Sequence, residues 1–213
     1  MASSVLLTRP DHDITTRYVS RWSEKIIDEA RNKGCDVVDL SGNKANRKRF
    51  IGTLKKKSPK LVVLNGHGDH DVVTGYDNEP ILNVSDEDVA GKIIYARSCE
   101  SAKTLGKECV KLGAAAYLGY DEDFIFWWDD EKVSHPLEDE TAALFLNPSN
   151  QVPLALLKGH TTEQANKKSK NLFAKNIERL LVAGSSDPDY HLIRYLYWDM
   201  KHQVCLGDNN ATF

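Results

Sequence analysis

A histidine and a cysteine each follow an apolar run of the sequence. The segment LVVLNGHG (61–68) leads into His67, and the segment IIYARSCE (93–100) leads into Cys99. A thiolate attacks acyl groups, an imidazole moves protons near neutral pH, and the glycines flanking His67 let backbone amides approach an oxyanion. These residue types therefore predict a cysteine acyl-transfer site, provided that the two runs are neighbouring strands of one sheet.

The residues after Cys99 carry a helical pattern of apolar positions that ends at Gly113. We expect Cys99 to begin this helix, because free amide hydrogens and the helix dipole favour a thiolate there. The other three cysteines, Cys35, Cys109 and Cys205, are interpreted as packing thiols. With four cysteines in 213 residues and no CxxC spacing, the sequence predicts reduced thiols in a cytoplasmic protein.

A metal site is the alternative for the first motif. His67 is followed closely by Asp69, His70 and Asp71, and such a set can bind zinc or a harder metal. Acyl transfer by a thiolate needs no metal and no organic cofactor, and no second ligand cluster follows the other apolar runs. We therefore expect no cofactor and keep a metal-dependent hydrolase as the less favoured interpretation.

Apolar runs alternate with helical patterns along the chain, which predicts an α/β fold with a mainly parallel sheet between two layers of helices. In such sheets the site lies at the carboxyl ends of the strands. A hairpin is expected over 71–84 and a short helix over 85–89. The predicted strands are 5–7, 37–40, 61–64, 93–96, 115–118 and 204–206, and the predicted longer helices are 16–33, 45–57, 102–112, 138–146, 161–182 and 190–201.

The composition is that of an ordinary globular chain. Its 213 residues favour one domain spanning 1–213, and a net charge of -3 argues against a basic nucleic-acid binder. No apolar run is long enough for a membrane span, and the first residues lack the pattern of a signal peptide.

Four segments together resemble the caspase-like (clan CD) cysteine peptidases, and most closely their gingipain-like and CHAT branches. They are LVVLNGHG (61–68), KIIYARSCESA (92–102), GAAAYLGY (113–120) and QVCLGD (203–208). The resemblance implies a three-layer α/β/α fold with six strands in the order 2-1-3-4-5-6, the last antiparallel. It implies His67 and Cys99 as a catalytic dyad, with the amides of Gly68 and Cys99 as the oxyanion hole. The chain lacks the QAC-type pentapeptide of caspases, so their preference for aspartate is not expected here.

Two sets of residues are candidates for binding the substrate. Asp121 and Asp123 follow the fifth apolar run, and Asp69 and Glu100 flank the dyad, so together they could attract a basic side chain. Alternatively, the nearby aromatic residues Phe124, Phe126, Trp127 and Trp128 form an apolar pocket, or fold under the domain as a satellite core. Relatives activated by calcium suggest that the acidic stretch 121–140 could also bind calcium weakly.

The sequence thus predicts a cysteine endopeptidase acting on a protein or peptide substrate. A caspase-like binding or signalling module with an idle dyad is the alternative. A regulatory protein is a further partner that the 121–140 segment could bind, whereas a membrane or a nucleic acid is not expected.

Overall fold

A six-stranded sheet forms the centre of the computed structural model, which describes residues 3–86 and 88–213. The strands lie in the order β2-β1-β3-β7-β8-β9, and all neighbours are parallel except β8 and β9. This confirms the predicted α/β fold class and strand order. The strands are β1 (Ser4–Arg9), β2 (Asp36–Ser41), β3 (Leu61–Asn65), β7 (Ile93–Arg97), β8 (Ala116–Tyr120) and β9 (Gln203–Gly207).

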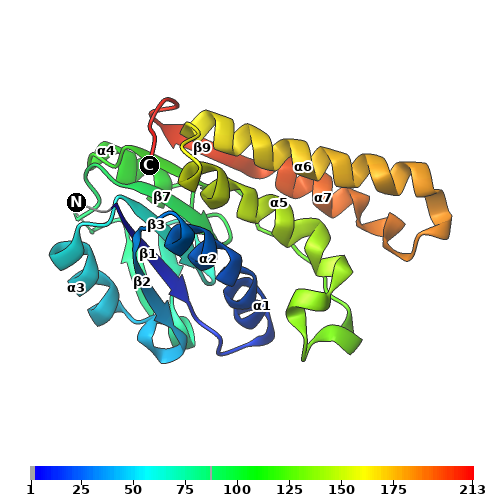
Figure 1. Ribbon diagram of the computed structural model, residues 1–213, viewed down its shortest axis with the longest axis horizontal. Helices are drawn as coiled ribbons and strands as arrows, with labels where there is room; N and C mark the ends of the chain where they lie inside the picture. The colour runs from blue at the N-terminus through cyan, green and yellow to red at the C-terminus, as the bar shows by residue number, and fades with distance from the viewer. Residues whose placement is uncertain (1–2, 87) are drawn as a thin grey trace.

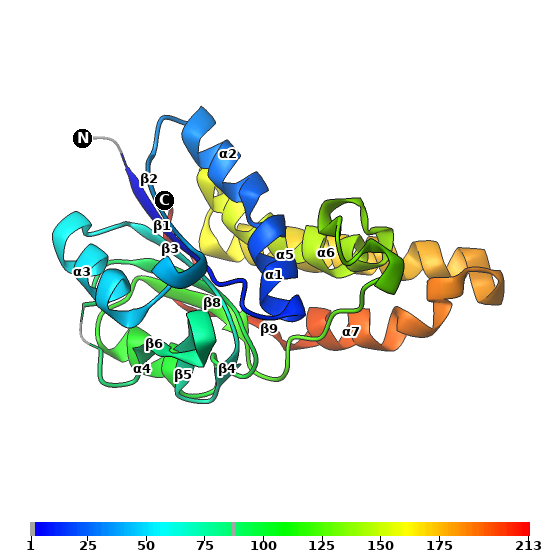
Figure 2. The ribbon, with the colours of Figure 1, turned by 90° about the horizontal axis from the view of Figure 1, so that it is seen from below.

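Helices cover both faces of this sheet (Figures 1 and 2). Because side chains alternate along a strand, Val62 and Leu64 of β3 pack toward one helical layer, while Leu61 and Val63 pack toward the other. The first layer holds α3 (Arg47–Lys57) and α4 (Leu105–Lys111), and the second holds α2 (Glu24–Asn32), α5 (Glu140–Leu157) and α6 (Thr162–Ala183). Burial on both faces explains why the strands read as unbroken apolar runs.

The expected helix over 16–33 is two helices, α1 (Ile14–Trp22) and α2, which meet at Ser23. The Ser23 hydroxyl donates to the carbonyl oxygen of Val19 at 2.8 Å, and such bonding to the preceding turn favours a bend. At its other end, α1 is capped by Asp13, whose carboxylate accepts the amide of Thr16 at 2.7 Å. The cap places Asp13 at the same sheet edge as the carboxyl end of β1.

Helix α5 is longer than the predicted 138–146 and continues through Pro148 and Pro153 to Leu157. Proline has no amide hydrogen, so Pro148 leaves the carbonyl oxygen of Leu144 without its partner within the helix. The side-chain amide of Asn176 on α6 donates to that oxygen at 2.7 Å. The last helix, α7 (Ile193–His202), begins three residues later than predicted, after a 3-10 segment. Figure 1 shows α5, α6 and α7 extending beyond the sheet.

The predicted hairpin is confirmed as part of a small antiparallel sheet with the order β4-β5-β6. Its strands are β4 (Gly68–Asp69), β5 (Val72–Thr74) and β6 (Pro80–Asn83). Of the short helix expected over 85–89, residues 85, 86, 88 and 89 form no helix, and residue 87 lies outside the described residues. None of the helices formed by the described residues combines the length and the apolar character that crossing a membrane requires.

Candidate active site

The loops that carry His67 and Cys99 leave the sheet side by side. Strands β3 and β7 are paired so that Asn65 lies opposite Arg97, and each candidate residue follows two positions later. Gly68 packs against the cysteine loop so closely that a β-carbon there would lie 2.7 Å from the carbonyl oxygen of Cys99. Only glycine allows this approach of the two backbones.

His67 is oriented by Asp13, a residue that the sequence analysis missed. Its Nε2 lies 2.7 Å from Oδ2 of Asp13, and 41% of the His67 side chain is exposed. An ionised carboxylate at Nε2 accepts the Nε2 proton and leaves Nδ1 as the basic nitrogen of the neutral ring. Asp13 follows β1 and His67 follows β3, so they flank the point where the strand order reverses, which could have indicated the pair.

The same carboxylate is held in its charged form. Partial burial opposes ionisation of Asp13, but the Thr16 amide and His67 outweigh it, and the pKa of Asp13 lies below its usual value. The loop of His67 is fixed as well, because the His67 carbonyl oxygen accepts hydrogen bonds from the Thr74 amide at 2.9 Å and the Thr74 hydroxyl at 3.1 Å. The hairpin therefore holds the histidine loop in place.

Cys99 does not begin a helix, contrary to the prediction. Residues 98–104 form bends and turns, and α4 begins only at Leu105. The first free amides of that helix, those of Thr104 and Leu105, donate to the carbonyl oxygen of His70 at 3.2 and 2.8 Å. These amides are therefore not available to a thiolate at Cys99.

The surroundings of Cys99 favour the protonated thiol, whereas the sequence predicts a thiolate. Its Sγ donates to the carbonyl oxygen of Phe124 at 3.9 Å. Burial, helped by the negative charge of Asp123, raises the pKa of Cys99 to about 11. The segment after β8 therefore covers the cysteine, and it is fastened to α7 because Trp198 Nε1 donates to the Asp123 carbonyl oxygen at 3.0 Å.

Glu100, directly after Cys99, has a left-handed backbone conformation with φ of 53°. The left-handed region is unfavourable for residues other than glycine, and residues with such backbone strain are concentrated at functional sites. The carboxylate of Glu100 lies 2.6 Å from Lys103 Nζ and 3.2 Å from His70 Nε2. Its charge is thus already paired. Asp69 is exposed and accepts the His70 amide at 2.6 Å.

The residues of the metal site that the sequence offered as an alternative lie in two separate groups in the structure. Within the described residues, Asp69 and His70 gather with Glu100, whereas His67 gathers with His12 and Asp13. Asp71 belongs to neither group. The expected ligand set of His67, Asp69 and His70 is therefore not brought together.

The remaining candidate specificity residues, Asp121, Asp123, Trp127 and Trp128, have different surroundings. Asp121 pairs with His202 Nδ1 at 2.9 Å, whereas Asp123 is exposed beside Cys99. Trp128 packs with Tyr18 at a ring distance of 5.8 Å in a small aromatic core, as the satellite-core interpretation predicted. Trp127 is 42% exposed and lines an open, largely apolar pocket of about 370 Å³. The other residues of this pocket are Ile125, Phe126, Trp128, Asp130 and Tyr195.

A buried guanidinium lies beneath both loops. Arg97, at the end of β7, is only 1% exposed, and burial lowers its pKa. It donates to Asn65 Oδ1 at 2.8 Å at the end of β3 and to Ser23 Oγ at 2.7 Å. Its other acceptors are Val19 O, Ser149 Oγ and Asn150 Oδ1.

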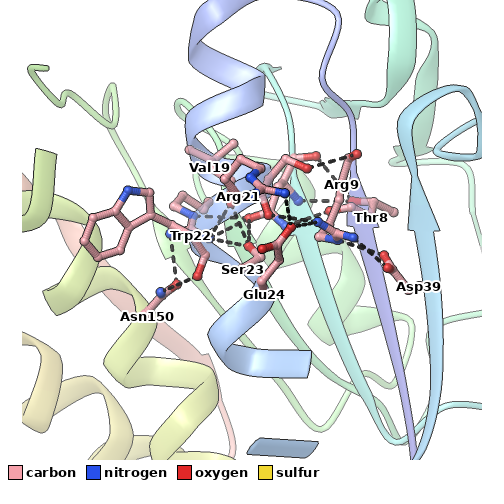
Figure 3. A network of polar contacts seen from close by, with 12 residues as sticks. Thr8, Arg9, Val19, Arg21, Trp22, Ser23, Glu24, Asp39 and Asn150 are labelled. Carbon is pink, nitrogen blue, oxygen red and sulfur yellow. Dashed lines mark hydrogen bonds and ion pairs between the residues drawn. The ribbon is translucent and has the colours of Figure 1, made fainter. Parts of the chain in front are cut away.

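Figure 3 shows the junction of α1 and α2 within a continuous polar network. Asn150 of α5 donates to the Trp22 carbonyl oxygen at 2.8 Å, and Arg9 of β1 lies 2.7 Å from Asp39 and 3.2 Å from Glu24. Together with Arg97, these contacts tie α1 to the ends of β1 and β3. They therefore set the position of Asp13 relative to His67.

The chain is similar in fold to a known cysteine proteinase. The crystal structure of the Arg-specific cysteine proteinase gingipain R (RgpB) superposes with a TM-score of 0.64, covering 99% of this chain and 47% of that one. A complex of Porphyromonas gingivalis RgpB pro- and mature domains gives a TM-score of 0.61, with coverage of 97% and 47%. Sequence identity is 10% in both comparisons, so the likeness shows a caspase-like fold and no particular branch.

The chain spans about half the length of these structures, 47% in each case. No protein-family model matches the sequence, and no curated protein matches it.

Proposed function

We propose that this chain is a cysteine endopeptidase that hydrolyses peptide bonds through an acyl-enzyme on Cys99. The observation that carries the proposal is the contact of His67 with the Asp13 carboxylate, 2.7 Å long, next to the loop of Cys99. A carboxylate-oriented histidine beside a cysteine, in a fold shared with a cysteine proteinase, supports this chemistry. Residues 1–213 would act as one peptidase domain.

In the proposed reaction, Cys99 Sγ gives its proton to Nδ1 of His67 and attacks the carbonyl carbon of the scissile bond. The amides of Gly68 and Cys99 stabilise the oxyanion that forms. His67 then returns the proton to the leaving amine as the C–N bond breaks. Water, deprotonated by His67, releases the acyl group and restores the thiol. Throughout, Asp13 stabilises the imidazolium.

The raised pKa of Cys99 means that the reaction starts from the thiol, whose proton His67 removes as the sulfur attacks. The hydrogen bond from the Cys99 thiol to the Phe124 carbonyl oxygen, at 3.9 Å, must break before His67 can take the thiol proton. A peptide substrate is proposed to enter beside Asp123, which is exposed next to Cys99. A protein or peptide is thus the proposed partner.

An idle binding module is the second candidate, and the half-buried thiol of Cys99, whose pKa is raised, favours it. The two candidates differ in turnover. Cleavage of a fluorogenic peptide library should be abolished in Cys99→Ala and in His67→Ala. Cys35→Ser is the matched control, because Cys35 is half-buried at the far end of the sheet, just before β2.

A thiol alkylator should inhibit cleavage, whereas a chelator should not. Turnover by Cys99→Ala equal to that of the unmodified chain would refute the peptidase. The absence of any turnover by correctly folded protein would favour the module. Activity that is lost on chelation and restored by zinc would instead favour the metal-dependent hydrolase.

A further inference from the structure

His12, Asp13 and His67 bring two imidazoles and a carboxylate together. One ligand atom from each of the three lies within 4.8 Å of the others. Oδ2 of Asp13 is 2.7 Å from His67 Nε2 and 3.6 Å from His12 Nε2. The first two residues lie between β1 and α1, and the third follows β3, so the cluster joins two separate segments of the chain.

This donor set suits zinc. Zn²⁺ binds histidine nitrogens and carboxylate oxygens at about 2.0–2.2 Å in a tetrahedron, which separates neighbouring ligand atoms by roughly 3.3 Å. The His12–Asp13 separation of 3.6 Å is close to that value, and the His67–Asp13 hydrogen bond needs to open only slightly. Oδ1 of Asn78 lies 3.3 Å from His12 Nε2, so a further oxygen is at hand.

The second cluster of the chain provides a contrast. Asp69, His70 and Glu100 also gather, but Lys103 Nζ lies 2.6 Å from Glu100 Oε1 and already supplies the cation. Asp13 has no ion pair with a lysine or arginine among the residues that the structure describes. The His12 side chain is 11% exposed, while Asp13 and His67 are more open, so the cluster is partly enclosed but reachable. The first cluster is therefore the better site.

We propose that His12, Asp13 and His67 form an inhibitory Zn²⁺ site. Zinc on Nε2 of His67 takes the lone pair of that nitrogen, so the proton of the neutral ring moves to Nδ1. Nδ1 then carries hydrogen and cannot accept the proton of Cys99. Binding of the metal stands by itself, whereas the inhibition rests on the proposed peptidase function.

Metal binding is tested directly on metal-free protein. Calorimetric titration with ZnCl₂ and the visible absorption of bound Co²⁺ should show one site in the unmodified chain. His12→Gln should weaken binding at least about tenfold, because one of three protein ligands is lost. His70→Gln is the matched control, since it removes the histidine of the other cluster, and it should bind as the unmodified chain does.

Cys99→Ala distinguishes this site from a metal bridging the thiol and His67, and it should keep its affinity. Loss of binding in Cys99→Ala, unaltered binding in His12→Gln, or no binding by the unmodified chain would each overturn the proposal. Should His12→Gln fail to fold, zinc added to the unmodified chain should shift the NMR signals of the His12 and His67 rings and leave that of His70. A shift confined to His70 would overturn the site.

Peptide cleavage then tests the inhibition. ZnCl₂ should inhibit the unmodified chain, and His12→Gln should retain the basal rate while needing at least about tenfold more zinc for half-inhibition. Equal sensitivity of the two proteins would refute the inhibitory role. A chain that binds zinc through His12 yet cleaves no peptide would contradict the peptidase function and leave the metal site standing.

Discussion

Nε2 of His67 lies 2.7 Å from Oδ2 of Asp13, so the histidine that follows β3 is bonded to the residue that caps α1. One carboxylate therefore both begins a helix and selects the tautomer of the ring. A change that moves the start of α1 is therefore expected to alter the orientation of the His67 ring.

We expect Asp13→Asn to lower kcat by about 10²- to 10⁴-fold, because an amide neither fixes the tautomer nor stabilises the imidazolium. Asparagine is also a good N-cap, so the free energy of unfolding should change little. Peptide cleavage and urea unfolding measure the two effects. Asp11→Asn, an exposed neighbour, is the control and should cleave normally. Equal activity of both variants would remove Asp13 from the mechanism.

Alkylation of Cys99 should be slow at neutral pH. Because the pKa of Cys99 is about 11, the thiolate fraction increases about tenfold for each unit by which the pH rises toward that value. Site-resolved mass spectrometry after iodoacetamide treatment gives the rate at each pH. Asp123→Asn removes a negative charge that raises this pKa, so it should speed labelling at fixed pH, whereas Asp121→Asn should not. An alkylation rate that does not change between pH 7 and 9 would show that Cys99 is already a thiolate there, and it would contradict the raised pKa.

A basic side chain before the scissile bond should be preferred, because Asp123 is exposed beside Cys99. Since an exposed pair is weak, Asp123→Asn should reduce the ratio of kcat/KM for arginyl over leucyl peptides by about fivefold, and less at high salt. Asp121, paired with His202, serves as the control. A hydrophobic preference that Asp123→Asn leaves unchanged and Trp127→Ala abolishes would assign specificity to the aromatic pocket. Preference for an aspartyl peptide would contradict both.

Arg97→Met should destabilise the protein by at least about 3 kcal/mol, because several buried acceptors lose their donor at once. Asn65 and Ser23 are among them. Arg21, 52% exposed and paired with Glu24, gives the matched control Arg21→Met, for which a change within about 0.5 kcal/mol is expected. Chemical unfolding measures both. If Arg97→Met were as stable as the control, the buried network would not hold α1 against the strands.

The central sheet could be predicted because the burial of its strands is visible in short segments of the sequence. The inner strands β1, β3, β7 and β8 are buried on both faces, so segments such as 61–64 read as unbroken apolar runs in the sequence. The predicted neighbours β3 and β7 then brought the loops of His67 and Cys99 to one edge.

What the sequence did not reveal depends on contacts between distant residues. The proline at 148 predicts a helix end, and only Asn176 on the next helix shows why α5 continues. The helical pattern of apolar residues after Cys99 does not show where α4 begins. The carbonyl oxygen of His70, and not the Cys99 sulfur, accepts the first amides of α4. The partner of His67 lies 54 positions away in the chain, and the buried environment of Cys99 comes from the segment at Phe124.

The Leu144 carbonyl group, which has no partner within α5 because of Pro148, fixes the register between α5 and α6. One turn of an α-helix rises by about 5.4 Å, so a slip of one turn changes which residues of two packed helices face each other. Here a slip of α6 along α5 would separate Asn176 from Leu144 and break this partly buried hydrogen bond, at a cost of about 1 kcal/mol. Because α5 also carries Ser149 and Asn150, which accept hydrogen bonds from Arg97, the register of α5 and α6 is connected through Arg97 to the ends of the strands that carry His67 and Cys99.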